Sequence, residues 1–512
     1  MVEVSVKVKL PFLWGKAVFK KERWNHINLI VGPNGSGKTL LAESISKQFE
    51  ERGYSVKFLK AERDSFYDTE AVHILQNNEV VRNRIQTVLS AMFGKSIVFK
   101  ESESNFVPVV VNRAWNVEYD LEEVECHGLK EIITLLVALY ANTGNTCLIF
   151  DEPELHLHPQ FQQFFADELR RVSKRHPKRM YFLITHSPFF VDLRFPEDLM
   201  GVIVCHTNRE PTHIDHLEKY DEDLLRRFLP RFNTYHKQFF FSDNQIFVEG
   251  YTDQQMFTNL LPYVYSEKST AGTGIIDVGG KDELGVFCKI CALLGTNSRI
   301  ITDLDSLFSG KLRDVFCEDE RVSLWIEKQT EKQLPFFKQV FSARELGIPL
   351  TLERMIRRLE RYIADVGREL CSEDFMPPQS LLVLVEKLIA LEQKHVNVEA
   401  VDTFKTVVMQ GVMNHGDDLQ KVLSPRIADS IPLMKNLFSI VIASAASASV
   451  FILPRGCIEH YYTQSCVQYM PVSAKDKLFH FELEHLLKSG EEDIRSEYGE
   501  LIAILESACA KT

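Results

Sequence analysis

A glycine-rich segment that directly follows an apolar strand constrains the fold of this chain more than any other feature. Residues 32–39 read Gly-Pro-Asn-Gly-Ser-Gly-Lys-Thr, between an apolar stretch at 26–31 and helical spacing over 39–49. Backbone N–H groups in such a turn, at a helix N-terminus, form a nest for phosphate oxygens. We expect the turn to bind ATP, with Lys38 at the β/γ-phosphates and the Thr39 hydroxyl on Mg²⁺. The predicted ATP-binding residues are Gly32, Pro33, Asn34, Gly35, Ser36, Gly37, Lys38 and Thr39.

Two later apolar strands end in side chains that suit phosphoryl chemistry. Residues 147–150 run into Asp151 and Glu152, and residues 181–184 run into Thr185 and His186. We expect Asp151 to hold Mg²⁺ through water, Glu152 to polarise the attacking water, and His186 to reach a γ-phosphate. Strand and helix patterns alternate through this region, which predicts a parallel α/β sheet.

A second acidic group lies about two hundred residues further along the chain. Glu249-Gly-x-x-Asp253 follows a predicted strand at 245–248, and Asp303-x-Asp305 follows another at 299–302. Four converging carboxylates would repel one another unless a divalent cation is present. We therefore expect Mg²⁺ or Mn²⁺ here, able to bind a phosphodiester and activate water. The alternative is a pair of unrelated polar turns.

The strand and helix patterns also indicate the domain organisation. We predict an α/β fold in two domains, 1–235 with a helical insertion at about 64–105, and 243–512 with a helical insertion at about 310–445. The second insertion is inferred because strand chemistry returns at 450–453. The close pair Cys288 and Cys291 lies in an apolar stretch without a second pair, which argues against a zinc site.

Composition limits the partners only weakly. The net charge of −12 argues against a wholly basic nucleic-acid surface but allows a local patch. Basic residues are densest at 170–179, where a solvated face is the favoured explanation. Arginines also lie at helical spacing over 354–361, where intrahelical pairing with Glu353 and Glu360 is an equally good explanation. No leader pattern and no apolar run of about 18 residues is apparent, so we expect a cytoplasmic protein without a membrane partner.

The first set of motifs resembles the ABC-type ATPases, most closely the subgroup with Asp-Glu-Pro-Glu-x-x-Leu-His-Pro, here residues 151–159. The family's signature helix is matched only by Cys126-His127-Gly128-Leu129-Lys130-Glu131, which lacks the usual Ser. The resemblance implies a homodimer or higher assembly, because such ATP sites close between two heads. The second set, with Asp277-Val-Gly-Gly-Lys281 between its two acidic pairs, resembles the Toprim fold.

An ATPase-like set of motifs followed by a Toprim-like set resembles the OLD (overcoming lysogenisation defect) nuclease family. This family includes the Gabija nuclease and the OLD effectors beside some retrons. This implies an ATP-regulated DNA endonuclease or nickase of anti-phage defence. It also implies that Glu459 is a further metal ligand and that Lys477, or else Lys475, is catalytic. A retron reverse transcriptase with its small DNA is the implied partner. The rival interpretation is a nucleotide-switched scaffold whose Toprim-like domain binds a partner or nucleic acid without cutting.

Overall fold

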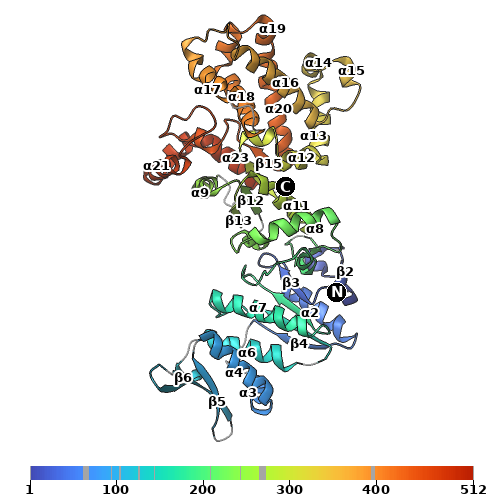
Figure 1. Cartoon of the computed structure of the whole chain (residues 1–512). Coiled ribbons are helices and arrows are strands. Elements are labelled where there is room, and N and C mark those ends of the chain that lie inside the picture. The colour runs from blue at the N-terminus through green and yellow to red at the C-terminus, as the bar shows by residue number, and fades with distance from the viewer. Residues whose placement is uncertain are drawn as a thin grey trace. The chain divides into compact units, whose positions relative to one another are not determined.

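The computed structural model describes residues 2–61, 69–93, 95–102, 105–112, 114–124, 127–142, 144–207, 209–242, 244–264, 272–393 and 398–510 (Figure 1). The chain divides into two compact units. The first is Met1–Asp243 with Leu293–Thr296, and the second is Asn244–Ala292 with Asn297–Thr512. The predicted extents of the functional domains, 1–235 and 243–512, stay predictions.

A six-stranded sheet organises the first unit, in the order β11-β10-β3-β9-β8-β4. Neighbouring strands are parallel except β10 and β11. The strands are β3 (Ile27–Val31), β4 (Ser55–Leu59), β8 (Thr146–Asp151), β9 (Met180–Ile184), β10 (Val202–Val204) and β11 (Thr212–His213). Every residue of β8 and β9 is buried, as expected for central strands covered on both faces. The helices α2 (Lys38–Glu50), α6 (His127–Ala141) and α7 (Pro159–Arg175) connect them.

Smaller elements surround this sheet. The hairpin of β1 (Val2–Val8) and β2 (Phe19–Trp24) flanks α1 (Pro11–Trp14), and η1 (Pro196–Gly201) and α8 (Lys219–Phe228) lie later in the unit. The predicted helical insertion at 64–105 begins as expected, with α3 (Thr69–Asn77) and α4 (Glu79–Phe93).

The end of that insertion was predicted wrongly, because a strand begins at Ser96. Strands β5 (Ser96–Ser102), β6 (Asn105–Asn112) and β7 (Val117–Asp120) form an antiparallel sheet. Ile97 and Phe99 are buried, and this alternation along β5 suits a strand with one covered face.

A four-stranded parallel sheet organises the second unit, in the order β13-β12-β14-β15. The strands are β12 (Asn244–Val248), β13 (Thr273–Asp277), β14 (Arg299–Thr302) and β15 (Val450–Ile452). Helices of this unit include α9 (Tyr251–Leu260), α11 (Lys281–Leu294), α21 (Lys475–Lys488), α22 (Glu491–Glu497) and α23 (Gly499–Cys509). Ile246, Met256, Ile301, Ile458 and Leu505 belong to one buried core between them. All four strands end at one edge, so residues that follow them are brought together.

Between β14 and β15 the chain forms a helical block, as the sequence predicts. It consists of α12 (Lys311–Cys317), α13 (Glu320–Lys332), α14 (Leu334–Val340), α15 (Ala343–Leu346), α16 (Leu352–Leu370), α17 (Leu382–Glu392), α18 (Val398–Val422), α19 (Pro425–Ala428) and α20 (Ser430–Ser447). Contrary to expectation, the helical stretch Pro425–Ser447 is long and apolar enough to cross a membrane by length and composition. A core helix passes the same test, and α20 packs on α16, α18 and β15.

Candidate nucleotide and metal sites

The turn between β3 and α2 has the backbone shape that its glycines allow. Gly32, Gly35 and Gly37 have φ values of 138°, 77° and 82°, in a region of backbone conformation that residues with a side chain rarely adopt. Lys38 Nζ donates to the carbonyl oxygens of Gly32 at 3.1 Å and Pro33 at 2.8 Å. The ammonium is therefore held within the turn itself, where a phosphate oxygen could exchange for a carbonyl.

The second predicted group of ATP residues lies at the same edge of the sheet. The Thr39 hydroxyl donates to Asp151 Oδ2 at 3.2 Å. Asp151 is buried at the end of β8, 5% exposed. The pair places a hydroxyl and a carboxylate oxygen together, the two oxygen types expected around Mg²⁺ at such a site.

Glu152 and His186 also face each other, as their predicted roles require. Nε2 of His186 lies 3.9 Å from Glu152 Oε1. Glu152 has a φ of 46°, which is uncommon for a residue with a side chain, and its N–H donates to the Ile184 carbonyl at 2.8 Å. Burial, and then the nearby Lys38 charge, lower the pKa of His186. The imidazole is therefore predominantly neutral at pH 7.

Glu154 is a residue to which sequence reasoning assigned no role. Its carboxylate accepts from the Thr185 hydroxyl at 2.9 Å and from the His186 N–H at 2.6 Å. Burial raises the pKa of Glu154, and these hydrogen bonds oppose that rise. The available signal was the second Glu of the Asp-Glu-Pro-Glu motif.

The helix that corresponds to the divergent signature begins at His127. Gly128 is buried, and a Cβ there would lie 2.7 Å from the His156 carbonyl oxygen, so the glycine permits a close approach of the two segments. Cys126 lies outside the described residues.

In the second unit, three of the predicted acids converge where β12 and β14 end. Glu249, Asp303 and Asp305 each offer a ligand oxygen, and these atoms all lie within 4.8 Å of one another. Glu249 Oε1 accepts from the Thr302 hydroxyl at 2.6 Å and from the Asp303 N–H at 2.9 Å. These bonds orient the Glu249 carboxylate toward β14. The cluster therefore depends on the parallel pairing of β12 with β14.

The remaining predicted acids surround this cluster. Asp253 Oδ2 accepts the Gly250 N–H at 3.0 Å at the start of α9. Burial, then Glu249 and Glu459, raise the pKa of Asp253 to about 8. Burial and the charge of Asp305 raise the pKa of Glu249, and burial with Glu249 raises that of Asp303. Without a cation, burial and mutual repulsion therefore shift these carboxyls toward the protonated form.

Of the two lysines that the sequence left open, the structure places Lys475 beside the acids. Its Nζ lies 3.4 Å from Glu459 Oε1 and 3.9 Å from Asp303 Oδ2. Glu459 is fully buried. Burial alone would lower the pKa of Lys475, but the carboxylates of Asp303 and Glu459 raise it overall. Both lysines are exposed on α21, but among the described residues the Lys477 side chain forms no hydrogen bond or ion pair with these acids.

A further lysine in the cluster was missed as a participant. Lys281 Nζ donates to Asp305 Oδ2 at 2.8 Å. Burial would lower the pKa of Lys281, but Asp305 raises it overall. Lys281 ends the segment 277–281, but its pairing with Asp305 depends on the fold rather than on the motif.

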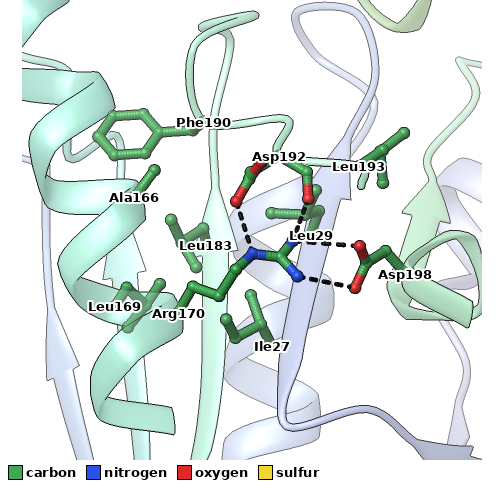
Figure 2. A pocket seen from close by; sticks show the side chains of 10 residues that line it. All are labelled: Ile27, Leu29, Ala166, Leu169, Arg170, Leu183, Phe190, Asp192, Leu193 and Asp198. Carbon is green, nitrogen blue, oxygen red and sulfur yellow. Dashed lines mark hydrogen bonds and ion pairs between the residues drawn. The ribbon is translucent and has the colours of Figure 1, made fainter. Parts of the chain in front are cut away.

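Several arginines of the basic runs that were considered for nucleic-acid binding form internal contacts. Figure 2 shows Arg170 of α7 at the edge of a small cavity, bonded to Asp192 and Asp198. Arg179 is buried and donates to the Leu139 carbonyl. In α16, Arg357 pairs with Glu353 four residues before it. Intramolecular pairing therefore explains these three arginines.

Comparison with known families agrees with this arrangement. Residues 122–191 match the AAA ATPase domain model. Residues 240–305 match the TOPRIM domain model of overcoming lysogenization defect protein-like proteins, and this segment ends at Asp305. The chain joins an AAA-type ATPase domain to an OLD-like Toprim domain. The predicted α/β fold class, the order of the two domains and the resemblance to the OLD family are thereby confirmed.

Similar proteins match only parts of this ATPase–Toprim chain. A protein named OLD nuclease from Thermus scotoductus is 24% identical over 192 residues, 36% of this chain and 34% of the relative. The alignment thus spans about a third of that relative's length. The SMC head domain from Thermotoga maritima has a TM-score of 0.30 at 13% identity, covering 42% of this chain and 100% of that one. Stu0660 of Streptococcus thermophilus has a TM-score of 0.27 at 11% identity, covering 46% and 86%.

Proposed function

We propose that this protein is an ATP-regulated, divalent-metal-dependent DNA endonuclease or nickase of the OLD type, acting in anti-phage defence in the cytoplasm. The observation that carries the proposal is the convergence of Glu249, Asp303 and Asp305 at one edge of the Toprim sheet. The matched families and the OLD nuclease relative support the same activity.

The donor set fits a hard cation. The three side chains that converge among the described residues all offer carboxylate oxygens, which suits Mg²⁺ or Mn²⁺ rather than a thiolate-binding metal. Asp305 Oδ1 is buried and accepts no hydrogen bond from the described residues, so it has an unused lone pair within the cluster. Bound metal would polarise the scissile phosphate and supply a hydroxide nucleophile.

The chain's own groups have distinct roles in the proposed cleavage. Glu249, Asp303 and Asp305 hold the cation, and Asp253 and Glu459 complete the acidic surroundings. Lys475 carries its charge next to Asp303 and Glu459, where it can stabilise the added negative charge of the phosphorane-like state. These placements favour Lys475 over Lys477 as the catalytic lysine.

The ATPase domain would regulate this chemistry. Lys38, Thr39 and Asp151 would bind ATP and Mg²⁺, while Glu152 would polarise the attacking water and His186 would reach the γ-phosphate. ATP would close the heads of two copies of this chain, and the closed homodimer, or a higher assembly, would align the nuclease site. A retron reverse transcriptase with its small DNA stays a predicted partner, testable by copurification.

Plasmid nicking tests the proposal directly. We expect the wild-type protein to nick supercoiled DNA with Mg²⁺ or Mn²⁺, and Glu249→Ala and Asp303→Ala to reduce the rate by at least ~100-fold. Asp374→Ala changes an exposed acid of the helical block and serves as the matched control. Phage plating on cells carrying wild type or Glu249→Ala tests the defence role. Nicking that survives in both cluster variants contradicts the assignment.

The alternative is a nucleotide-switched scaffold that binds a partner or nucleic acid without cutting. The observation in its favour is that Lys281 and Lys475 already place two positive charges against Asp305, Asp303 and Glu459. Under this alternative no metal or nucleotide condition yields nicking, while ATP still changes the assembly state in sedimentation.

A further inference from the structure

Glu154 connects the two strand ends that carry the candidate ATPase side chains. Its carboxylate follows β8 by three residues and accepts two hydrogen bonds from the first residues after β9, Thr185 and His186. The His186 bond, at 2.6 Å, comes from the backbone N–H of the residue whose imidazole faces Glu152. The contact therefore fixes the backbone of His186 without involving its ring.

The geometry that this contact holds is strained. Glu152 adopts a φ of 46°, and conformations of this kind persist only where the surroundings determine them. The segment after β8 and the segment after β9 are joined at two points. The Glu152 N–H donates to the Ile184 carbonyl, and two residues further along the Glu154 carboxylate accepts from Thr185 and His186. Together they hold the 3.9 Å approach of Glu152 to His186.

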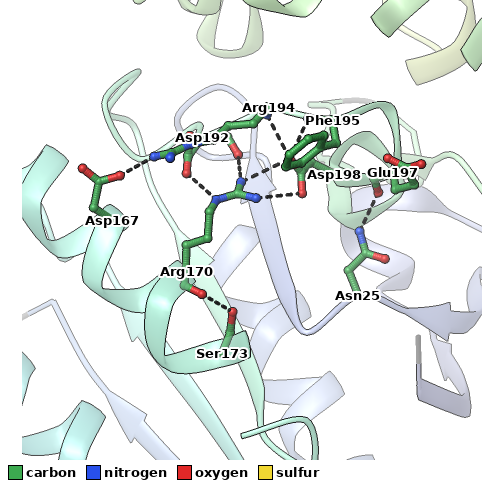
Figure 3. A network of polar contacts seen from close by, with 9 residues as sticks. All are labelled: Asn25, Asp167, Arg170, Ser173, Asp192, Arg194, Phe195, Glu197 and Asp198. Atoms are coloured by element: carbon green, nitrogen blue, oxygen red, sulfur yellow. Dashed lines mark hydrogen bonds and ion pairs between the residues drawn. The ribbon is translucent and has the colours of Figure 1, made fainter. Parts of the chain in front are cut away.

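Helix α7 anchors the segment that continues from His186. Ser187 donates its hydroxyl hydrogen to Gln162, whose amide donates to the Leu157 carbonyl at 2.8 Å. Further along, Arg170 donates to Asp192 Oδ2 at 2.6 Å and to both Asp198 oxygens at 3.2 Å (Figures 2 and 3). Figure 3 also shows Arg194 bonded to Asp192. The backbone after His186 is thus tied to the helix that follows Asp151 and Glu152.

We propose that Glu154 is a positioning residue for ATP hydrolysis, acting through hydrogen bonds that hold His186 opposite Glu152. The proposal rests on the ATPase activity proposed above. Glu154 would accept no proton from the attacking water and would not touch nucleotide. Its carboxylate would act only as an acceptor for Thr185 and His186.

Two substitutions separate positioning from chemistry. Glu154→Ala removes both acceptors, and we expect kcat for ATP to fall about 10- to 100-fold with KM changed less than about twofold. Glu154→Gln can keep both contacts, because its carbonyl accepts the His186 N–H and its amide can donate to the Thr185 hydroxyl. We therefore expect Glu154→Gln to retain kcat within about threefold, whereas Glu152→Gln loses activity.

Hydrogen exchange by mass spectrometry over residues 181–190 gives a readout independent of turnover. We expect faster exchange of the His186 amide in Glu154→Ala than in wild type or Glu154→Gln. Glu50→Gln, on the exposed end of α2, is the matched control. Unchanged kcat in Glu154→Ala, or equal loss in Glu154→Gln and Glu154→Ala, overturns the inference. Absence of hydrolysis in wild type refutes the proposed ATPase function, while exchange still tests the contact.

Discussion

Lys281 Nζ lies 2.8 Å from Asp305 Oδ2, so one of the three clustered acids is already paired with a positive charge. A cation entering the cluster and this ammonium both interact favourably with the same carboxylate. The Lys281 ammonium therefore competes with a metal ion for Asp305 and weakens metal binding. The sequence motif alone does not show this competition.

Replacing Lys281 by Met is expected to strengthen metal binding. Removing the ammonium leaves Asp305 without its counter-ion and increases repulsion among the acids, which a divalent cation relieves. Because both side chains are partly exposed, we expect a gain of about 3- to 10-fold in Mn²⁺ affinity, or roughly 1 kcal/mol. Titration calorimetry measures the Mn²⁺ affinity of each variant, with Lys477→Met as the control. Weaker binding in Lys281→Met would contradict the competition.

Lys475 and Lys477 are expected to differ sharply in the nicking assay. Of these two lysines, Lys475 is the one whose Nζ lies near the carboxylates of Glu459 and Asp303. If it stabilises charge in the transition state, Lys475→Ala reduces the nicking rate by ~100-fold or more, since loss of one such group has effects of this size. Lys477→Ala should stay within about threefold of wild type, because its side chain is exposed outside the cluster. Equal effects of the two substitutions would remove Lys475 from the proposed mechanism.

Stability of the metal-free protein should fall as pH rises from about 5 to 8. Asp253 has a pKa of about 8 in the folded state, and Glu249 and Asp303 are also raised. In the unfolded chain such groups release protons near pH 4, so the folded state binds more protons across this window. Stability therefore decreases with increasing pH there. Thermal unfolding in EDTA measures the slope.

Added Mg²⁺ should oppose that loss, because the cation binds the ionised carboxylates of the folded state. The difference in unfolding temperature between Mg²⁺ and EDTA should then grow from pH 5 to 8. Asp253→Asn should reduce the EDTA slope. A pH-independent difference would show that these acids do not bind the metal.

Gly32→Ala should destabilise the ATPase domain more than Gly35→Ala does. Both glycines have positive φ, at 138° and 77°. A Cβ on Gly32 would lie 2.3 Å from the Cys205 carbonyl oxygen, whereas at Gly35 nothing lies within 4 Å. We expect a loss of roughly 2–3 kcal/mol at Gly32 and about 1 kcal/mol at Gly35. Urea unfolding measures both, and equal losses would contradict the close approach to Cys205.

Much of the fold could be predicted because the decisive signals are local. The strands predicted at 181–184 and 299–302 agree with β9 and β14 to within one residue. Short apolar runs bounded by polar segments are typical of such buried parallel strands. The insertion at 64–105 was harder, because its strand β5 follows directly on two helices and gains its partner only from β6.

The sequence by itself determined the phosphate loop, the acids at the ends of β8, β12 and β14, and the order of two α/β domains. Each of these depends on residues close together in the chain. The tertiary structure decided that Lys475 rather than Lys477 meets the acids, that Lys281 pairs with Asp305, that Glu154 holds His186, and that Arg170 serves an internal network. These contacts depend on which side chains, distant in sequence, are brought within about 4 Å of one another by packing. Hydrogen bonds form only at such short distances, and ion pairs are strongest there.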